Sequence, residues 1–239
     1  MTVQRLKSER SDPVSGGFYT VGEAARLLGI QHASKVTGWL QGRKGTHAGP
    51  VIVRQYKPVE NVQEVGFWDL IEIRFVDHFR RQGVSLQALR KAAQTAREEW
   101  KVQHPFALSK AKYMKDRKHI FQITAEEEKD ETLLNLVTKQ FAMYVVIEEV
   151  LDRGTTFDPA TGLAREWRPS VKEFPHVLLS PTIAYGQPSV SGVPTSAIYS
   201  SWRAEEGEFD AVADWFSIEP KLVREAVEFE LSLPSRMRS

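Results

Sequence analysis

The stretch YTVGEAARLLGIQHASKVTGWLQG, residues 19–42, constrains the fold of this chain more than any other. Thr20 precedes Glu23 by three positions, a spacing typical of a capping box at the start of a helix. Apolar residues then recur at helical spacing up to Gly29, which is expected to end the helix, and a second helix is expected from about Ser34. Two short helices joined by a glycine-containing turn predict a helix-turn-helix.

The residues that follow predict a wing behind this helix pair. Glycines and basic residues precede the alternating run VIVRQY at residues 51–56, which is typical of a short hairpin strand. Two further helices are expected in residues 70–100, separated by Gly83, with Ser85 capping the second. Residues 18–103 are therefore predicted to form a winged helix-turn-helix domain, and the polar residues 1–17 before them a flexible arm.

Residues 104–180 are predicted to form a middle segment of mixed structure. A hairpin with its turn at residues 116–117 is expected first, and a helix that begins at the capping box of residues 124–127 follows it. Two short strands are expected around a turn at residues 158–162, and another strand at HVLLSP, residues 176–181.

Residues 181–233 begin with a boundary rich in proline and glycine and then predict a small helical module, followed by a tail at residues 234–239. The expected helices are 195–205, 209–216 and 220–231. The predicted fold class is mainly α with small β elements (α+β): an N-terminal winged helix-turn-helix, a middle hairpin and helix segment, and a C-terminal three-helix module that resembles a second helix-turn-helix.

Charge is distributed unevenly along the 239 residues. Residues 1–120 contain 21 Lys and Arg against 11 Asp and Glu, whereas the remainder contains 11 against 20, so formal charges of +10 and −9 nearly cancel. A basic half of this size favours binding to a polyanion. Between Arg203 and Glu230 there are 3 basic and 9 acidic residues, so phosphates would repel the C-terminal module. Its many aromatic residues favour a protein partner or self-association, although they are also consistent with a compact three-helix core.

Polar side chains on the second helix of the first pair are the candidates for DNA recognition, because they can bond base edges or phosphates. Basic residues toward the predicted wing extend the same surface. The candidate DNA-binding residues are Gln31, His32, Ser34, Lys35, Thr37, Gln41, Arg43, Lys44 and Arg54. The alternative is that the helices only pack, since any antiparallel helix pair has this periodicity. The candidate partner-binding residues in the C-terminal module are Trp202, Trp215 and Phe216.

Little in the sequence favours an enzyme. Zero cysteines exclude disulfides and thiolate zinc sites, and the six histidines are scattered without a His-x-x-x-His pair. The match of Ser109 and Lys112 to Ser-x-x-Lys lacks the companion motifs and is at chance level. No catalytic residue, cofactor or metal site is predicted. With no apolar run of membrane-spanning length and no signal peptide, the chain is expected to be cytoplasmic and to have no contact with a membrane.

Two stretches of the chain resemble a known family. The segment WDLIEIRFVDHFRRQGVSLQALRKAAQTA, residues 68–96, is similar to the winged-helix DNA-binding region of the MerR-like antitoxins of the VapBC class. Residues 179–230 are similar to the small helical C-terminal domain of the same proteins. The pattern that carries this second resemblance is Pro181, Gly186, Pro188 and Gly192 ahead of the helices, with the run from Ala226 to Glu230 at the end.

The resemblance implies an antitoxin of a type II toxin–antitoxin pair, whose partner is a PIN-domain ribonuclease. Such a protein blocks the nuclease by direct contact and represses its own operon by binding promoter DNA, usually as a homodimer. Because a PIN nuclease holds its metal with clustered carboxylates, Arg236 or Arg238 of the tail is expected to reach that acidic site. Two alternatives stay open: a stand-alone MerR-like transcription regulator whose C-terminal region dimerises or senses a small ligand, and a structural adaptor that never touches DNA.

Overall fold

The computed structural model of the chain describes residues 16–42, 49–56, 64–138 and 153–234, with only the backbone at 110–118 and 138. These residues form a mainly helical fold with small antiparallel strand pairs, which confirms the predicted α+β class. In chain order the elements are β1 (Tyr19–Thr20), α1 (Val21–Leu27), α2 (Ala33–Gln41), β2 (Glu64–Val65), α3 (Phe67–Arg81), α4 (Leu86–Trp100), the 3₁₀ turn η1 (Pro105–Ala107), α5 (Lys110–Glu127), α6 (Glu131–Thr138), β3 (Thr155–Phe157), β4 (Ala164–Trp167), the 3₁₀ turn η3 (Ala184–Gly186), β5 (Ser189–Val190), β6 (Val193–Pro194), α8 (Thr195–Ala204), α9 (Phe209–Phe216) and α10 (Pro220–Ser232).

The start of α1 is the predicted capping box. Thr20 Oγ1 accepts the backbone N–H of Glu23, and the Glu23 carboxylate accepts the backbone N–H of Thr20 at 2.8 Å. Gly29 follows the helix with a φ of +62°, a conformation that glycine adopts at little cost, and the chain turns into α2. The predicted cap of α4 is also confirmed, since Ser85 Oγ accepts the N–H of Ala88.

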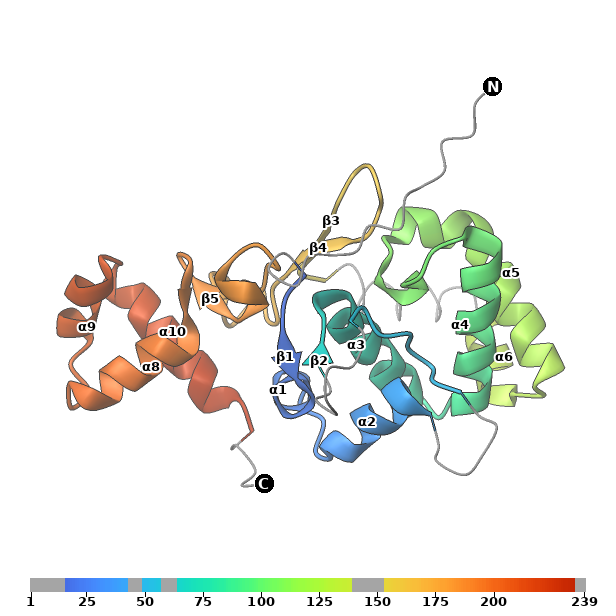
Figure 1. The fold of residues 1–239 in the computed structure, drawn as a ribbon, viewed down its shortest axis with the longest axis horizontal. Coiled ribbons are helices and arrows are strands. Elements are labelled where there is room, and N and C mark those ends of the chain that lie inside the picture. The colour runs from blue at the N-terminus through green and yellow to red at the C-terminus, as the bar shows by residue number, and fades with distance from the viewer. Residues whose placement is uncertain (1–15, 43–48, 57–63, 139–152, 235–239) are drawn as a thin grey trace.

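Two clusters of buried apolar side chains hold the fold together. The larger one surrounds α3 and draws on residues from Tyr19 to Leu179; in it the Phe75 ring stacks on Phe106 with centroids 4.3 Å apart. The smaller cluster joins α8, α9 and α10 and includes Val223 and Phe229. Figure 1 shows these three helices at one end of the molecule and α4, α5 and α6 at the other.

The hairpin expected with its turn at residues 116–117 is wrong, because residues 110–127 form the continuous helix α5. Its sequence contains four Lys, two Ala and two Glu, which favour helix, and its second half buries Ile120, Phe121 and Ala125 in the larger core. The capping box expected at residues 124–127 is also wrong, since both positions lie inside α5. The next helix, α6, begins instead at Glu131, and Asp130 accepts the N–H of Leu133. Residues 139–152, into which the predicted helix extended, lie outside the described part of the chain.

The strand expected at residues 51–56 is not formed either, because these residues run through bends. The backbone N–H groups of Val51 and Ile52 both bond the carbonyl of Trp39, so the segment folds back onto α2 instead of pairing as a strand. The strands expected around residues 158–162 are confirmed as β3 and β4. Residues 176–181 form isolated bridges, among them Leu178 with Ser189, in place of the expected strand.

Polar contacts join the C-terminal part of the chain to residues 18–26. The backbone N–H of Phe18 bonds the carbonyl of Tyr185, and the buried hydroxyl of Tyr19 donates to the carbonyl of Gly186. Farther along α1, Arg26 forms an ion pair with Glu230 of α10. The three helices expected in this part of the chain are confirmed as α8, α9 and α10. In the described residues, every helix is too short or too polar to cross a membrane.

Candidate nucleic-acid interface and partner surface

The α2 helix buries one face and exposes the other. Val36, Trp39 and Leu40 are buried against the core. Among the predicted DNA-binding residues, the exposed ones are Gln31, His32, Ser34, Lys35 and Gln41, and Thr37 is half-buried. Because no carboxylate lies on this helix, the exposed face is polar with a single lysine.

The other three predicted DNA-binding residues lie in the segment after α2. Arg43 and Lys44 fall outside the described residues. Arg54 is half-buried, and its Nε and Nη2 atoms are buried without a hydrogen-bond partner in the described part of the chain. Its guanidinium is therefore less accessible than expected for a phosphate contact made from a wing.

Two arginines of α4 fix the segment that follows α2. Arg90 Nε donates to the Gly49 carbonyl at 2.7 Å, and Arg97 Nη2 donates to the Val51 carbonyl at 2.8 Å. Since Val51 in turn bonds Trp39, these contacts hold the C-terminal end of α2 against α4. The arrangement gives the exposed α2 face a rigid support.

Many of the arginines behind the basic charge of residues 1–120 are committed to internal contacts. Besides Arg90 and Arg97, the committed side chains are Arg26 with Glu230, Arg74 with Thr155, Arg80 with the Val84 carbonyl and Arg81 with Asp77. From the sequence, these charges are expected to be available to a polyanion. Within the described residues, a large share of them instead satisfies carbonyls and carboxylates of the fold.

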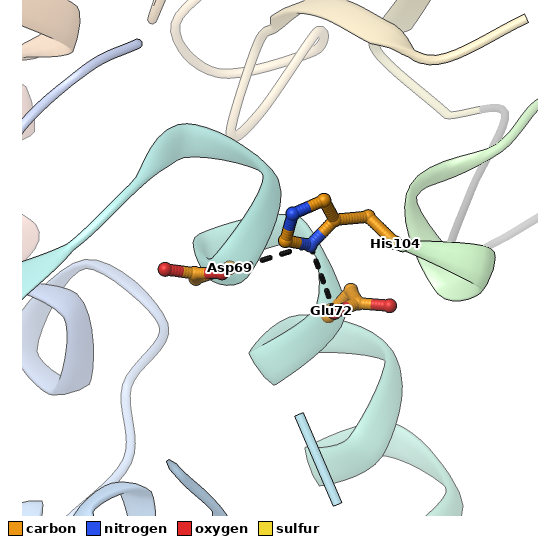
Figure 2. A group of neighbouring side chains, drawn as sticks. All are labelled: Asp69, Glu72 and His104. Atoms are coloured by element: carbon orange, nitrogen blue, oxygen red, sulfur yellow. Dashed lines mark hydrogen bonds and ion pairs between the residues drawn. The ribbon is translucent and has the colours of Figure 1, made fainter. Parts of the chain in front are cut away.

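A buried polar cluster inside the larger core was missed by the sequence analysis. Asp69 and Glu72 lie on the inner side of α3 and converge with His104, which precedes η1 (Figure 2). His104 Nδ1 lies 3.3 Å from Glu72 Oε2 and 3.7 Å from Asp69 Oδ1. All three side chains are at most 5% exposed. A buried charge of this kind is costly unless it is paired and hydrogen-bonded.

The cluster contains residue types that could hold a metal ion, but its oxygens already have partners. Asp69 accepts the backbone N–H groups of Gln55 and Gly66, and Glu72 Oε1 accepts the N–H of Phe106 while Oε2 faces His104. The protein's own N–H groups thus supply the contacts that a cation would otherwise make. The cluster therefore serves best as a structural junction between α3, η1 and the segment after α2.

Burial shifts the pKa values of this cluster. Desolvation raises the pKa of the Asp69 carboxyl from 3.8 to about 6, against the opposing effect of His104. Desolvation by itself would lower the pKa of His104, but the hydrogen bond that its ring donates to the Glu72 carboxylate and the charges of Glu72 and Asp69 outweigh it, so that pKa is raised. The pKa of Arg97 is lowered by its burial, although Glu72 opposes this.

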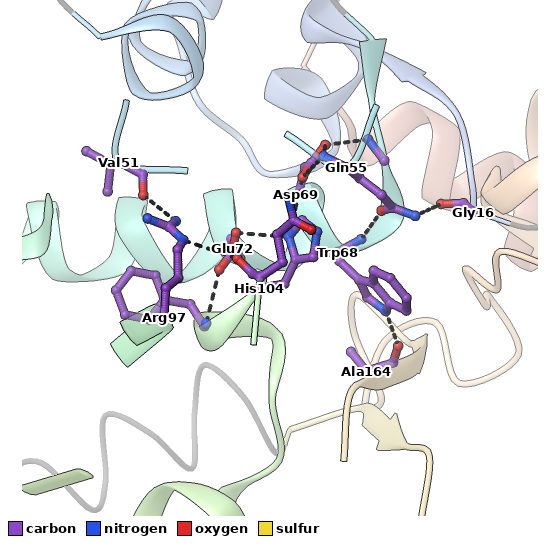
Figure 3. A network of polar contacts seen from close by, with 12 residues as sticks. Gly16, Val51, Gln55, Trp68, Asp69, Glu72, Arg97, His104 and Ala164 are labelled. Carbon is purple, nitrogen blue, oxygen red and sulfur yellow. Dashed lines mark hydrogen bonds and ion pairs between the residues drawn. The ribbon is translucent and has the colours of Figure 1, made fainter. Parts of the chain in front are cut away.

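Further contacts extend the cluster across the core (Figure 3). The Gln55 side chain accepts the N–H of Trp68 and donates to the Gly16 carbonyl. The indole Nε1 of Trp68 donates to the Ala164 carbonyl of β4 at 2.9 Å. The network therefore links the segment after α2, the start of α3 and the β3–β4 pair.

The C-terminal module presents the predicted partner-binding aromatics in two different ways. Trp215 on α9 is 70% exposed. Trp202 on α8 is half-buried, its Nε1 donates to the Gly207 carbonyl, and its ring lies against Phe209. Phe216 is half-buried as well. Arg236 and Arg238 of the tail lie outside the described residues.

Acidic side chains surround these aromatics, as the sequence predicts. The exposed ones on and between α8, α9 and α10 are Glu206, Glu208, Asp210, Asp214, Glu219 and Glu228. Arg224 lies over the Phe209 ring at 4.1 Å. The exposed part of this module is therefore acidic with one prominent indole.

Comparisons with known proteins find a shared fold. A scan against models of protein families gives no match, and a sequence search of curated proteins also gives none. The structure is similar to the crystal structure of Rv2018 from Mycobacterium tuberculosis, with a TM-score of 0.64 and 23% sequence identity over 87% of this chain and 96% of that chain. At this identity the similarity establishes the fold alone.

Proposed function

We propose that this protein is a DNA-binding antitoxin of a type II toxin–antitoxin pair. In this proposal α1 and α2 form the helix-turn-helix, α2 enters the major groove of the promoter, and the C-terminal module binds a PIN-domain ribonuclease. The observation that carries the DNA-binding half is the exposed polar face of α2, on a helix whose opposite face is fully packed.

The rigid support of α2 favours recognition over simple packing. A polar outer face is common to surface helices, so the exposed face of α2 does not by itself distinguish recognition from packing. Arg90 and Arg97 also fix the segment after α2, and a recognition helix needs such fixed placement because base contacts require side chains in a fixed register on the duplex. Since Lys35 is the one cation on this face, the DNA contact draws further positive charge from other parts of the chain.

The exposed Trp215 supports the partner-binding half. Interface hot spots are enriched in tryptophan, and a lone exposed indole in an acidic surround favours a partner with a cationic rim. The α9 helix lies at the end of the molecule away from α4, α5 and α6 (Figure 1). In the same proposal Arg236 or Arg238 reaches the acidic metal site of the nuclease.

The test combines DNA binding and nuclease inhibition. The protein is mixed with DNA from upstream of its own gene in a gel-shift assay, and it is co-expressed with the PIN-domain ribonuclease encoded beside it. We expect a specific shift, co-purification of the nuclease and loss of its activity. The double variant Arg236→Ala, Arg238→Ala should restore nuclease activity while leaving the gel shift in place.

The alternative function is a stand-alone MerR-like regulator, acting as a homodimer. Specific DNA binding without any inhibited nuclease would favour that alternative over the antitoxin. A protein that inhibits the nuclease but never shifts upstream DNA would remove the repressor role. Absence of both results would leave the structural adaptor and overturn the proposal.

A further inference from the structure

A cavity of about 640 Å³ lies where the C-terminal module meets α1. Its walls come from Arg26 of α1, from α8 and from the last turns of α10. Sites for small molecules are concave and hold roughly 300–1,000 Å³, so this cavity has a suitable size. Neither the DNA-binding face of α2 nor the exposed Trp215 contributes to it.

Of the charged side chains that line the cavity, two form an ion pair with each other and one cation has no such partner in the described part of the chain. Arg26 is fully engaged: its Nη1 and Nη2 each lie 3.1 Å from Glu230 Oε2, and its Nε donates to the Pro234 carbonyl at 2.9 Å. These two wall residues therefore neutralise each other. Arg203, exposed in the last turn of α8, has no hydrogen bond or ion pair within the described part of the chain. An unpaired guanidinium at a cavity wall favours a carboxylate or phosphate group.

The remaining walls offer hydroxyls and an apolar surface. Ser200 Oγ donates to the Ser196 carbonyl, so its lone pairs can still accept a hydrogen bond. The half-buried Tyr199 ring, supported by Trp202 at a centroid distance of 5.9 Å, lies on the same wall. Leu231, which is 60% exposed, lines the cavity too and would be covered by an apolar group.

We propose that this cavity binds a small organic anion, a carboxylate or phosphate carried on an apolar body. The anionic group accepts hydrogen bonds from the Arg203 guanidinium, and the apolar body covers Tyr199 and Leu231. Because Arg26 forms one wall while tying α1 to α10, a bound ligand stabilises the contact between the C-terminal module and the first helix pair. The site goes beyond the proposed function and does not depend on it, since binding is measured on the protein alone.

The experiment uses phenyl phosphate and phenylacetate as two anionic probes and benzyl alcohol as the uncharged control. Each is titrated at millimolar concentration into the ¹⁵N-labelled full chain, and amide chemical shifts are followed. We expect at least one anion to shift amides of residues 196–204 and 230–233, and benzyl alcohol to bind far more weakly. The two anions show whether phosphate or carboxylate is preferred.

Two variants locate the contact. Arg203→Gln should weaken binding about tenfold, the loss of one charge-assisted contact, without a change in unfolding midpoint because the side chain is exposed. Lys221→Gln removes an exposed cation of the same module outside the cavity and should bind the probes like the unmodified protein. The proposal is overturned if neither anion binds, if Arg203→Gln binds equally well, or if Lys221→Gln loses as much.

Discussion

Arg26 and Glu230 are 204 positions apart in the chain, and their ion pair joins the first helix to the last. Both terminal nitrogens of Arg26 contact the same carboxylate oxygen, while the other oxygen, Oε1, accepts the hydroxyl of buried Thr195 at 2.7 Å. The Glu230 carboxylate therefore has partners both on α1, through Arg26, and in the C-terminal module, through Thr195. Through this ion pair the C-terminal module contacts α1 directly.

Replacing Arg26 with Gln should lower the free energy of unfolding by about 2 kcal/mol, because the buried Glu230 carboxylate would lose its cationic partner. Urea denaturation provides the measurement. In the double variant with Glu230→Gln, the total loss should be smaller than the sum of the two single losses. Strict additivity would show that the two side chains do not interact.

Stability should decrease as the pH rises, because of Asp69 and His104. The pKa of Asp69 is raised from 3.8 to about 6 in the folded state, so the folded state binds this proton more tightly than the unfolded chain does. The contribution of Asp69 to the free energy of unfolding therefore falls as the pH rises between these two values. The raised pKa of His104 stabilises the fold below 6.5, and that stability is lost as pH rises through the folded pKa. Glu72 and Arg97 are the other charged groups that act on His104 in this cluster.

The measurement is the urea midpoint over a pH series. His104→Gln should remove the part of the decrease above pH 6.5, which is the ordinary pKa of histidine. His119→Gln, an exposed histidine on α5, serves as the matched control and should retain the full decrease. A pH profile that is the same in His104→Gln and in the unmodified protein would contradict the assignment.

Lys35→Ala should weaken DNA binding and lower the salt dependence of the binding constant by about one phosphate contact. The reason is that Lys35 is the exposed cation on the α2 face. A gel-shift titration over several salt concentrations measures the slope. Lys172→Ala removes an exposed lysine far from α2 in the sequence and should leave the slope unchanged, and equal slopes for both variants would argue against α2 as the DNA-binding helix.

Trp215 and Trp202 should respond differently to substitution. Trp215→Ser should leave the unfolding midpoint nearly unchanged, since the side chain is 70% exposed, yet it should reduce capture of the protein partner. Trp202→Ala should destabilise the protein by about 3 kcal/mol, because the half-buried ring packs on Phe209 and its N–H bonds Gly207. Partner capture by Trp215→Ser at the level of the unmodified chain would remove Trp215 from the interface.

Gly186→Ala should destabilise the protein more than Gly192→Ala. The two glycines have nearly the same φ, +85° and +83°, so the backbone strain of a Cβ is similar at both, about 1 kcal/mol. At Gly186 the new Cβ would also lie 2.7 Å from the Tyr19 hydroxyl and 2.9 Å from Gly17 Cα, whereas at Gly192 nothing lies within 4 Å. Thermal unfolding of the two variants measures the difference, and equal losses would show that the close approach costs nothing.

Local signals predicted the helices well where they were strong. The capping box at Thr20, the stop at Gly29 and the cap at Ser85 depend on neighbouring residues, and all three are present in the structure. The α5 helix was missed because the sequence around residues 116–117 contains turn-compatible residues and no clear apolar stripe. Packing of its second half into the core decides the outcome there, and such contacts cannot be derived from local sequence.

The buried cluster of Asp69, Glu72 and His104 could be predicted from the sequence only in part. Nearly every neighbour of Asp69 and Glu72 on α3 is a large apolar residue, so the burial of both carboxylates could have been inferred from a helix that is apolar on most sides. The burial of His104 beside these carboxylates could not have been inferred, because it depends on the path of the chain after α4. The exposure of the α2 face was predictable from helical periodicity, whereas the internal use of Arg90 and Arg97 was not.

The contact of Tyr19 with Gly186 also bears on how the protein forms during synthesis. The buried hydroxyl of Tyr19 finds its acceptor 167 positions later in the chain. Early segments usually fold as they leave the ribosome, and β1 can pair with β2 early in synthesis. The Tyr19 hydroxyl, however, lacks its acceptor until most of the polypeptide has emerged. The packing around Tyr19 at the start of the first helix therefore reaches its final form only after the ribosome has nearly finished the message.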